Sequence, residues 1–220
     1  APTVSAGVNQ MKNGLFTQVG TASDPAPSSG IVLTSWSKVS GPGTITFGSP
    51  SSLTTTISAD GDGIYVIRLT VIDNAGNSTN SDFNLIWDTT AATGSWTSPA
   101  GGSKLNGTVS LSANASDTNS IASVTFSYKI NDGLDTFHNI ISFTSGPYTA
   151  SWDTSSLTID SYTLRMRILD AAGNITAVVL LVEVVAIIPQ GSISPSNTTQ
   201  DSVQITWTTN LPTRSRVIYD

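Results

Sequence analysis

The stretch YVIRLTVIDNAGNST, from Tyr65 to Thr79, is repeated as YTLRMRILDAAGNIT from Tyr162 to Thr176. The two copies are 97 residues apart. A repeat of this length is too long for one unit of a solenoid and matches a single β-sandwich domain. The sequence therefore predicts an all-β chain of tandem antiparallel β-sandwiches.

The composition agrees with this fold and limits the function classes. The chain has 220 residues, of which 38% are hydrophobic and 11% are charged. This is enough apolar material for one or two cores, but not for three complete ones. The net charge of −6 argues against a nucleic-acid or anionic-membrane partner, because both need a basic surface. No apolar stretch is long enough to cross a bilayer, so we expect no membrane insertion.

Residues 1–88 contain seven short strand-like runs separated by turn signals. Trp36 lies on the third run, where an Ig-like sandwich places its core indole. Tyr65 lies at the start of the sixth run, where a corner tyrosine bonds to the backbone through its hydroxyl. The runs span residues 3–8, 15–23, 31–39, 44–47, 53–59, 64–73 and 81–87.

Three segments carry a family resemblance for this first domain: ASDP (22–25), SWSKVSGPG (35–43) and YVIRLTVIDNAGN (65–77). Together they resemble the PKD family, an Ig-like sandwich of secreted enzymes, surface-layer proteins and receptors. The resemblance covers most of residues 1–88 and implies an extracellular or cell-surface location. The family's more common W-D-F-G-D-G signature is absent, so no ligand residues are carried over.

Residues 89–187 form the second predicted domain, with Asn131-Asp132-Gly133 as a hairpin turn. Three segments resemble the bacterial Ig-like repeats of adhesins and of accessory regions in carbohydrate-active enzymes: SPAGGSKLNGTVSLSANASD (98–117), GPYTASWDTSS (146–156) and YTLRMRILDAAGN (162–174). The resemblance implies no catalytic residue. The predicted strands span 109–115, 121–130, 137–143, 148–153, 162–170 and 175–185.

Residues 188–220 hold three strand-like runs, which is less than half a sandwich. A piece this short buries too little apolar surface to fold alone. ITWTTNLPTRSRVIY (205–219) resembles the start of fibronectin type III-like domains, including those that precede phosphatase domains. We expect this segment to continue in a longer chain, to dock on the second domain, or to be completed by another molecule.

The sequence contains no motif of a catalytic site. There is no G-x-S-x-G, no H-E-x-x-H and no phosphate-binding loop. The single histidine, His138, lies in a strand-like run without a partner motif. We therefore expect no enzymatic activity.

Calcium is the one candidate cofactor that the sequence indicates, because the oxygen atoms of Asp and Asn side chains are among the ligands that calcium prefers. The resemblance to bacterial Ig-like arrays implies a site between modules, with Asp88 of the linker WDTTAAT as a ligand and Asp24 or Asp117 nearby. The alternative is that these carboxylates stabilise turns. The turn interpretation is favoured for Asp60-Gly61-Asp62-Gly63 and for Asp73 and Asp170, which begin the repeated D-x-A-G-N turns.

The segment AVVLLVEVVAIIP, residues 177–189, is apolar on both faces except for Glu183. An edge strand of this kind needs a cover. The cover is either the C-terminal segment of the same chain or another molecule, through strand complementation. The predicted interface consists of Val178, Val179, Leu180, Leu181, Val182, Val184, Val185, Ile187, Ile188 and Trp207.

These observations predict a non-catalytic extracellular or cell-surface protein that acts as a spacer, an adhesin segment or a subunit of a surface filament or surface layer. Its expected partners are other protein subunits, including copies of itself, or surface polysaccharide. One alternative is an accessory carbohydrate-binding region of a secreted hydrolase; another is the N-terminal region of a phosphatase-like enzyme. Sugar binding would use stacked aromatic rings, for which the candidates are Trp96, Trp152, Tyr148 and Phe137, although core packing is the favoured role for each.

Overall fold

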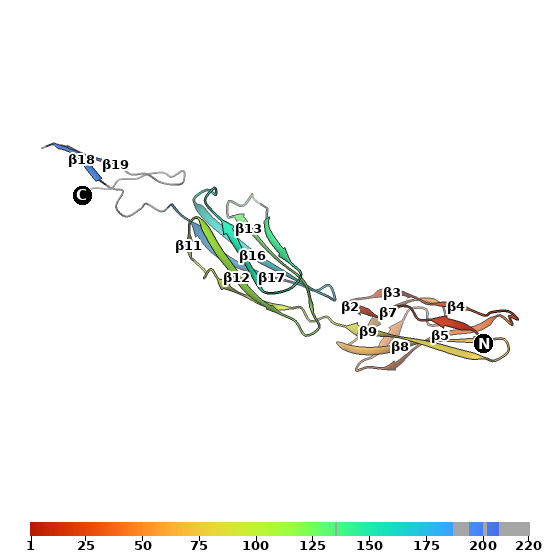
Figure 1. Cartoon of the computed structure of the whole chain (residues 1–220). Helices are drawn as coiled ribbons and strands as arrows, with labels where there is room; N and C mark the ends of the chain where they lie inside the picture. The colour runs from red at the N-terminus through yellow and green to blue at the C-terminus, as the bar shows by residue number, and fades with distance from the viewer. Residues whose placement is uncertain (135, 187–193, 200–201, 207–220) are drawn as a thin grey trace. The chain divides into compact units, whose positions relative to one another are not determined.

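The structure is a computed structural model that describes residues 1–134, 136–186, 194–199 and 202–206. Every regular element in these ranges is a β-strand, which confirms the predicted all-β fold (Figure 1). None of the described residues belongs to a helix long and apolar enough to cross a membrane. Contacts divide the chain into a first unit, residues 1–91 with 170–174, and a second unit, residues 92–169 with 175–220.

The first unit is a sandwich of a four-stranded sheet, in the order β2-β9-β8-β5, and a three-stranded sheet, in the order β3-β7-β6. A short ladder pairs β1 with β4. All neighbours are antiparallel except β2, which runs parallel to β9. The strands are β1 (Thr3–Ser5), β2 (Gln10–Lys12), β3 (Phe16–Val19), β4 (Thr21–Ser23), β5 (Ile31–Ser40), β6 (Ile45–Phe47), β7 (Thr54–Ala59), β8 (Gly63–Asp73) and β9 (Ser78–Trp87).

The predicted run 15–23 is divided into β3 and β4 at Gly20, where the chain changes its pairing partner from β7 to β1. A Cβ atom at Gly20 would lie 2.5 Å from Leu69 Cδ2 and 3.0 Å from a ring carbon of Trp36. Only glycine therefore lets the backbone pass this close to the core. The sequence predicted the strand but not its division, because the constraint comes from residues far along the chain.

The core of the first unit is built on the alternation of β8, whose inward side chains include Tyr65, Leu69 and Val71. Trp36 is buried among them and donates from its indole nitrogen to the Ser52 carbonyl at 2.8 Å. The Tyr65 hydroxyl donates to the Gly61 carbonyl at 2.6 Å. The predicted core indole and corner tyrosine are both confirmed.

The second unit is a sandwich of a five-stranded sheet, in the order β11-β17-β16-β13-β14, and a three-stranded sheet, in the order β10-β12-β15. The predicted hairpin between β13 and β14 is confirmed by their antiparallel pairing and by Gly133, whose φ is 81°. The strands are β10 (Thr93–Ser98), β11 (Lys104–Leu105), β12 (Thr108–Ser116), β13 (Ile121–Ile130), β14 (His138–Phe143), β15 (Tyr148–Asp153), β16 (Asp160–Asp170) and β17 (Ile175–Val184).

The second core is a separate aromatic cluster centred on Phe126. Its ring centroid lies 4.6 Å from that of Trp96 and 5.2 Å from that of Phe143. The Tyr162 hydroxyl bonds to the Thr158 carbonyl at 3.0 Å, which repeats the corner of the first unit. The doubled sequence thus encodes the same strand and the same corner in both sandwiches.

Beyond the second sandwich, β18 (Ser194–Thr199) pairs with β19 (Ser202–Thr206) in an antiparallel ladder. This hairpin belongs to the segment expected to resemble the start of a fibronectin type III-like domain. The third predicted run of that segment, residues 213–220, lies outside the described residues, as does Trp207.

Candidate interaction and metal sites

The outward face of β17 carries a row of apolar side chains, Ile175, Ala177, Val179 and Leu181, here called the apolar stripe. Ile175 is 54% exposed, and Val179 and Leu181 are each 59% exposed. Alternate residues of a strand point to opposite faces of the sheet, so these four share one face. The stripe is therefore on the side of the sheet opposite the core.

The structure divides the predicted interface residues between the two faces of β17. Val182 and Val184 are buried in the core of their own sandwich, and Val178 and Leu180 pack against that core. These four side chains thus pack in the core of the second unit, whereas Val179 and Leu181 face outward. Val185 follows the strand and is half-buried; Ile187, Ile188 and Trp207 lie outside the described residues.

The edge of β17 is partly covered by its own domain. β11 pairs in parallel with Glu183 and Val184, and Gly102 donates its backbone N–H to the Leu181 carbonyl at 2.8 Å. Trp96 donates from its indole nitrogen to the Val178 carbonyl at 3.3 Å. The sequence analysis missed β10 and β11, because TGSWTS and KL show no aliphatic alternation, and so it sought the cover only in the C-terminal segment or another molecule.

The repeat provides an internal comparison for the apolar stripe. β9 pairs with β8 in the same register as β17 pairs with β16, so each residue of β9 corresponds to the residue 97 positions later in β17. The outward residues at the four matching positions of β9 are polar: Ser78, Asn80, Asp82 and Asn84. The outward face of this strand is thus polar in the first sandwich and aliphatic in the second, so the fold itself does not require aliphatic side chains there.

Two buried carboxylates, Asp88 and Asp170, meet inside the first unit. Asp88 is 3% exposed and Asp170 is 1% exposed, and carboxylate oxygens of the two lie within 4.8 Å of each other. Two carboxylates this close repel each other unless a proton or a cation lies between them.

The surroundings of this pair are oxygen-rich. Asp170 accepts hydrogen bonds from the backbone N–H groups of Gly173 and Asn174 at 2.7 and 2.8 Å. The Asn174 side chain donates to the Asp88 carbonyl at 2.9 Å and accepts from Asn13 at 2.9 Å. Carboxylate, amide and carbonyl oxygens are the donor set that calcium prefers, so the residues present fit such an ion.

The other predicted metal ligands, Asp117 and Asp24, each accept backbone hydrogen bonds. Asp117 belongs to the second unit and accepts the backbone N–H groups of Asn119 and Ser120 at 2.8 and 3.2 Å. Asp24 accepts the backbone N–H groups of Ser29 and Gly30, both at 2.9 Å, in the turn after β4. Asp24 is not among the described carboxylates that cluster with Asp88.

The Asp60–Gly63 segment is a turn, as the sequence analysis favoured. Asp60 accepts the backbone N–H of Thr44 at 2.6 Å, and this bond holds the pKa of Asp60 below its ordinary value. Asp62 accepts the backbone N–H of Thr89 at 2.9 Å, which likewise lowers the pKa of Asp62. Both carboxylates therefore hold this loop against backbone that is distant in the sequence.

In both copies of the D-x-A-G-N turn, the aspartate accepts two backbone N–H groups of its own turn. Asp73 accepts those of Ala75 and Asn77 at 2.9 and 2.8 Å, whereas Asp170 accepts those of Gly173 and Asn174. The Asn77 side chain also donates to Asp73 at 2.7 Å and is the main cause of the lowered pKa of Asp73. The predicted turn role is confirmed for both aspartates.

Most of the aromatic candidates for sugar stacking pack in or against the core of the second unit. Trp152 is buried in the core, and Trp96 and Tyr148 pack against it. Phe137 is half-buried and lies against the Arg165 guanidinium, whose central carbon is 3.7 Å from the ring centroid. His138 is exposed beside the ring of Tyr128 at 5.3 Å.

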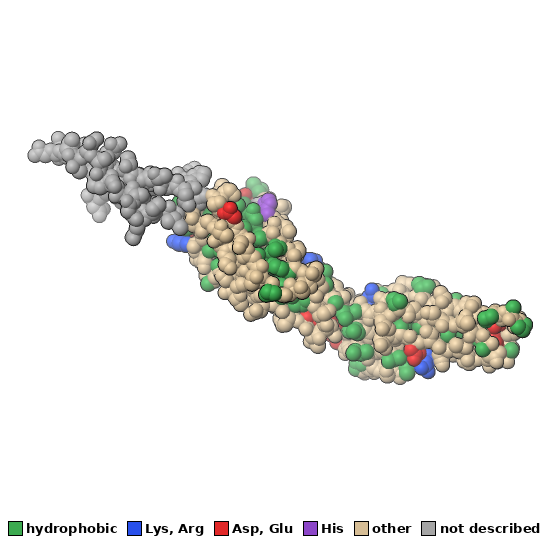
Figure 2. All heavy atoms as spheres, in the orientation of Figure 1, with side chains coloured by type: hydrophobic (Ala, Val, Ile, Leu, Met, Phe, Trp, Pro, Cys, Tyr) green, Lys and Arg blue, Asp and Glu red, His purple; other side chains and the backbone are tan. Residues whose placement is uncertain are grey.

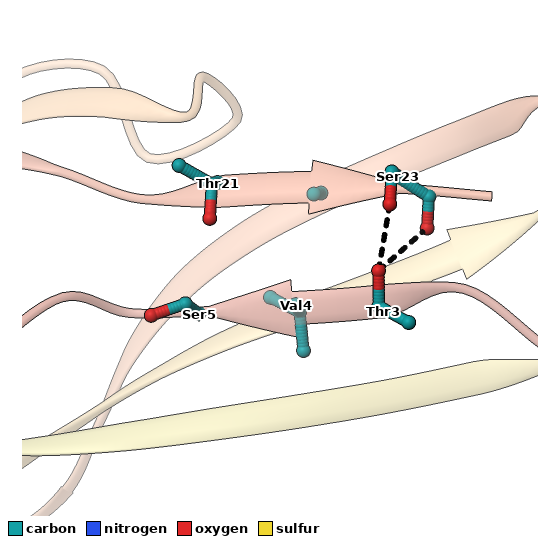
Figure 3. A pocket seen from close by; sticks show the side chains of 6 residues that line it. Thr3, Val4, Ser5, Thr21 and Ser23 are labelled. Carbon is teal, nitrogen blue, oxygen red and sulfur yellow. Dashed lines mark hydrogen bonds between the residues drawn. The ribbon is translucent and has the colours of Figure 1, made fainter. Parts of the chain in front are cut away.

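A shallow depression runs along the β1–β4 ladder in the first unit (Figure 3). Its lining contains no charged side chain, and its hydroxyl groups bond to one another: Thr3 Oγ1 lies 2.7 Å from Ser23 Oγ. It therefore offers no poised acid, base or nucleophile. The lining residues are Thr3, Val4, Ser5, Thr21, Ala22 and Ser23. On the face that Figure 2 shows, few of the described side chains are charged and hydrophobic groups lie among them.

Two domain families match the sequence. Residues 15–86 match the K319L-like PKD domain, and residues 93–166 match the bacterial Ig domain. No curated protein matches the chain. Ig-like and PKD domains are generally non-catalytic and are typical of extracellular structural or adhesion modules.

The chain is also similar to several solved structures. The fibronectin(III)-like modules of Clostridium thermocellum CbhA are 17% identical, with a TM-score of 0.46, and the match covers 84% of this chain and 94% of that one. The PKD domain of the KIAA 1837 protein is 26% identical, with a TM-score of 0.34 over 39% of this chain and 84% of that one. A tetra-tandem repeat from the extending region of a large adhesion protein is 17% identical, with a TM-score of 0.36 over 94% of this chain and 62% of that one.

The first sandwich thus matches the PKD domain model and the second sandwich matches the bacterial Ig domain model.

Proposed function

We propose that this chain is a non-catalytic structural or adhesive segment of a cell-surface protein, and that it acts through the outward face of its second sandwich. The observation that carries the proposal is the exposure of the apolar stripe on β17. A soluble domain gains nothing from aliphatic side chains at positions where its own repeat places Ser78, Asn80, Asp82 and Asn84. Clustered apolar groups of this kind are typical of a protein contact surface.

The test is an attachment assay with cells that produce the protein. The double substitution Val179→Asp with Leu181→Asn gives β17 the residues that β9 carries at the matching positions. We expect attachment of these cells to partners or surfaces to fall about tenfold or more, because the apolar contact is lost. The chain should stay folded, since both positions are exposed.

The matched control is Asn80→Ala on β9, which changes an exposed position of the first sandwich. It should leave attachment as it is in the unaltered protein. Unchanged attachment of the β17 variant, with normal amounts of protein on the surface of intact cells, would refute the proposed function.

We further propose that Asp88 and Asp170 bind calcium. The support is the close approach of these two buried carboxylates. A cation would remove their repulsion and stabilise the folded state.

Calcium is expected to raise the melting temperature by several degrees relative to the same protein in chelator. A free ion at about one hundred times its Kd adds roughly 2.7 kcal/mol. The substitution Asp88→Asn should remove this gain, whereas Asp24→Asn should preserve it. Isothermal titration calorimetry gives the stoichiometry, and identical melting curves with and without calcium would exclude the site.

A further inference from the structure

Both sandwiches have an arginine in the middle of the inner strand, but the residue opposite this arginine differs between them. In the first sandwich Arg68 on β8 lies opposite Asp82 on β9, and its Nε and Nη2 each donate to that carboxylate at 2.8 Å. In the second sandwich Arg165 on β16 occupies the matching position, but the residue opposite is Val179. The second sandwich thus has the guanidinium of the first, but a valine in the place of its carboxylate.

Arg165 is held in place without that carboxylate. Its Nε donates to the Ser127 hydroxyl at 3.3 Å, and its guanidinium stacks on the ring of Phe137. Stacking uses the face of the guanidinium and leaves the in-plane N–H groups at its end directed away from the ring. These contacts orient the guanidinium so that both Nη atoms can donate hydrogen bonds to one carboxylate.

Two more cations lie on the same face. Arg167 lies opposite Ala177 of the apolar stripe, and Lys129 places its ammonium 5.5 Å from the Phe137 ring centroid. No carboxylate among the described residues forms a salt bridge with Lys129, Arg165 or Arg167. Three of the nine Lys and Arg residues of an acidic chain therefore gather beside one row of aliphatic side chains.

We propose that this face, formed by the apolar stripe with Arg165, Arg167, Lys129 and Phe137, binds an acidic segment of a partner protein. The partner lays aliphatic side chains on the stripe and supplies a carboxylate to Arg165, in the place that Asp82 takes beside Arg68. This inference rests on the proposed function, which assigns contact to the same face, and it adds the chemistry of the occupant.

Other occupants fit this face less well. Sugars are bound mainly by flat aromatic rings, whereas this surface presents Ile, Val and Leu side chains. A second copy docked face to face through the same surface would bring its own Lys129, Arg165 and Arg167 against these cations, which costs energy. Charge complementarity therefore favours an acidic protein partner over both.

The experiment measures binding of a labelled short peptide that alternates valine and aspartate, by fluorescence anisotropy at low salt. The unaltered chain should bind it, and added salt should weaken binding because exposed charges are screened. The variant Val179→Asp recreates the arrangement of the first sandwich and should weaken binding about tenfold or more. The variant Arg165→Gln should do the same. The control Asn80→Ala alters an exposed position of the first sandwich and should leave binding unchanged.

Four outcomes would overturn the inference. They are equal binding of a valine–lysine peptide, no binding of the valine–aspartate peptide, preferential binding of a uronate oligosaccharide, and a dimer in sedimentation that Val179→Asp abolishes. Hydrogen exchange of β16 and β17 shows whether each variant is folded. If the peptide fails but cell attachment still depends on the stripe, this inference is wrong and the proposed function stands; if attachment does not depend on the stripe, the proposed function itself is wrong.

Discussion

Replacing Phe126 with alanine is expected to destabilise the second sandwich by about 4 kcal/mol. The ring is fully buried and lies in edge or tilted contact with Trp96 and Phe143, so its removal leaves a cavity and deletes two aromatic contacts. Native-state hydrogen exchange should report the loss as faster exchange in β13 and β16. The amides of β8 should keep their protection, because the two cores are separate clusters.

Leu134→Ala is the control for this substitution. Leu134 is 90% exposed, so its truncation should change the free energy of unfolding by less than about 0.5 kcal/mol. If Phe126→Ala accelerated exchange equally in β8 and β16, the two sandwiches would unfold as one cooperative unit. That result would contradict the independence of their cores.

Much of the fold could be predicted because the repeat carries local signals. Tyr65 and Tyr162 begin alternating strands, and Asp73 and Asp170 end them in turns that need one carboxylate and one glycine. These requirements involve residues that are close together in the sequence, so the sequence alone was enough to predict them. The division at Gly20 was not, because it reflects the distance to Leu69 and Trp36.

The candidate sites were predictable only in part, for a similar reason. The excess of apolar residues in β17 was evident, yet the sequence alone could not say which half faced the core. The register of β16 against β17 decides this, since it places Val179 opposite Arg165 and Leu180 opposite Leu164. A direct alignment of the two repeats beyond Thr79 and Thr176 would have shown Asp82 matched by Val179, and this was the signal that the sequence analysis missed.

The second large effect is expected at Asp170, where substitution by alanine should destabilise the protein by about 3 kcal/mol. The carboxylate accepts hydrogen bonds from the backbone N–H groups of Gly173 and Asn174 and from the Asn174 side chain. Alanine would leave these donors without their acceptor. Asn174 would also lose the support that directs its amide toward the Asp88 carbonyl at 2.9 Å.

The measurement is thermal unfolding in the presence of chelator, so that any loss of bound calcium does not contribute to the difference. The substitution also relieves the repulsion between Asp170 and Asp88, and we expect the loss of three hydrogen bonds to outweigh that gain. The matched variant Asp73→Ala removes the bonds that Asp73 accepts from the Ala75 and Asn77 backbone and from the Asn77 side chain, and it should also lower the melting temperature. Asp170→Asn should be milder than Asp170→Ala, because its single carbonyl oxygen can still accept from the turn. A melting temperature of Asp170→Ala equal to that of the unaltered protein would mean that the turn is held by its glycine and not by the buried carboxylate. The repeated aspartate would then have to be explained by its approach to Asp88, since that is the feature its counterpart Asp73 does not share.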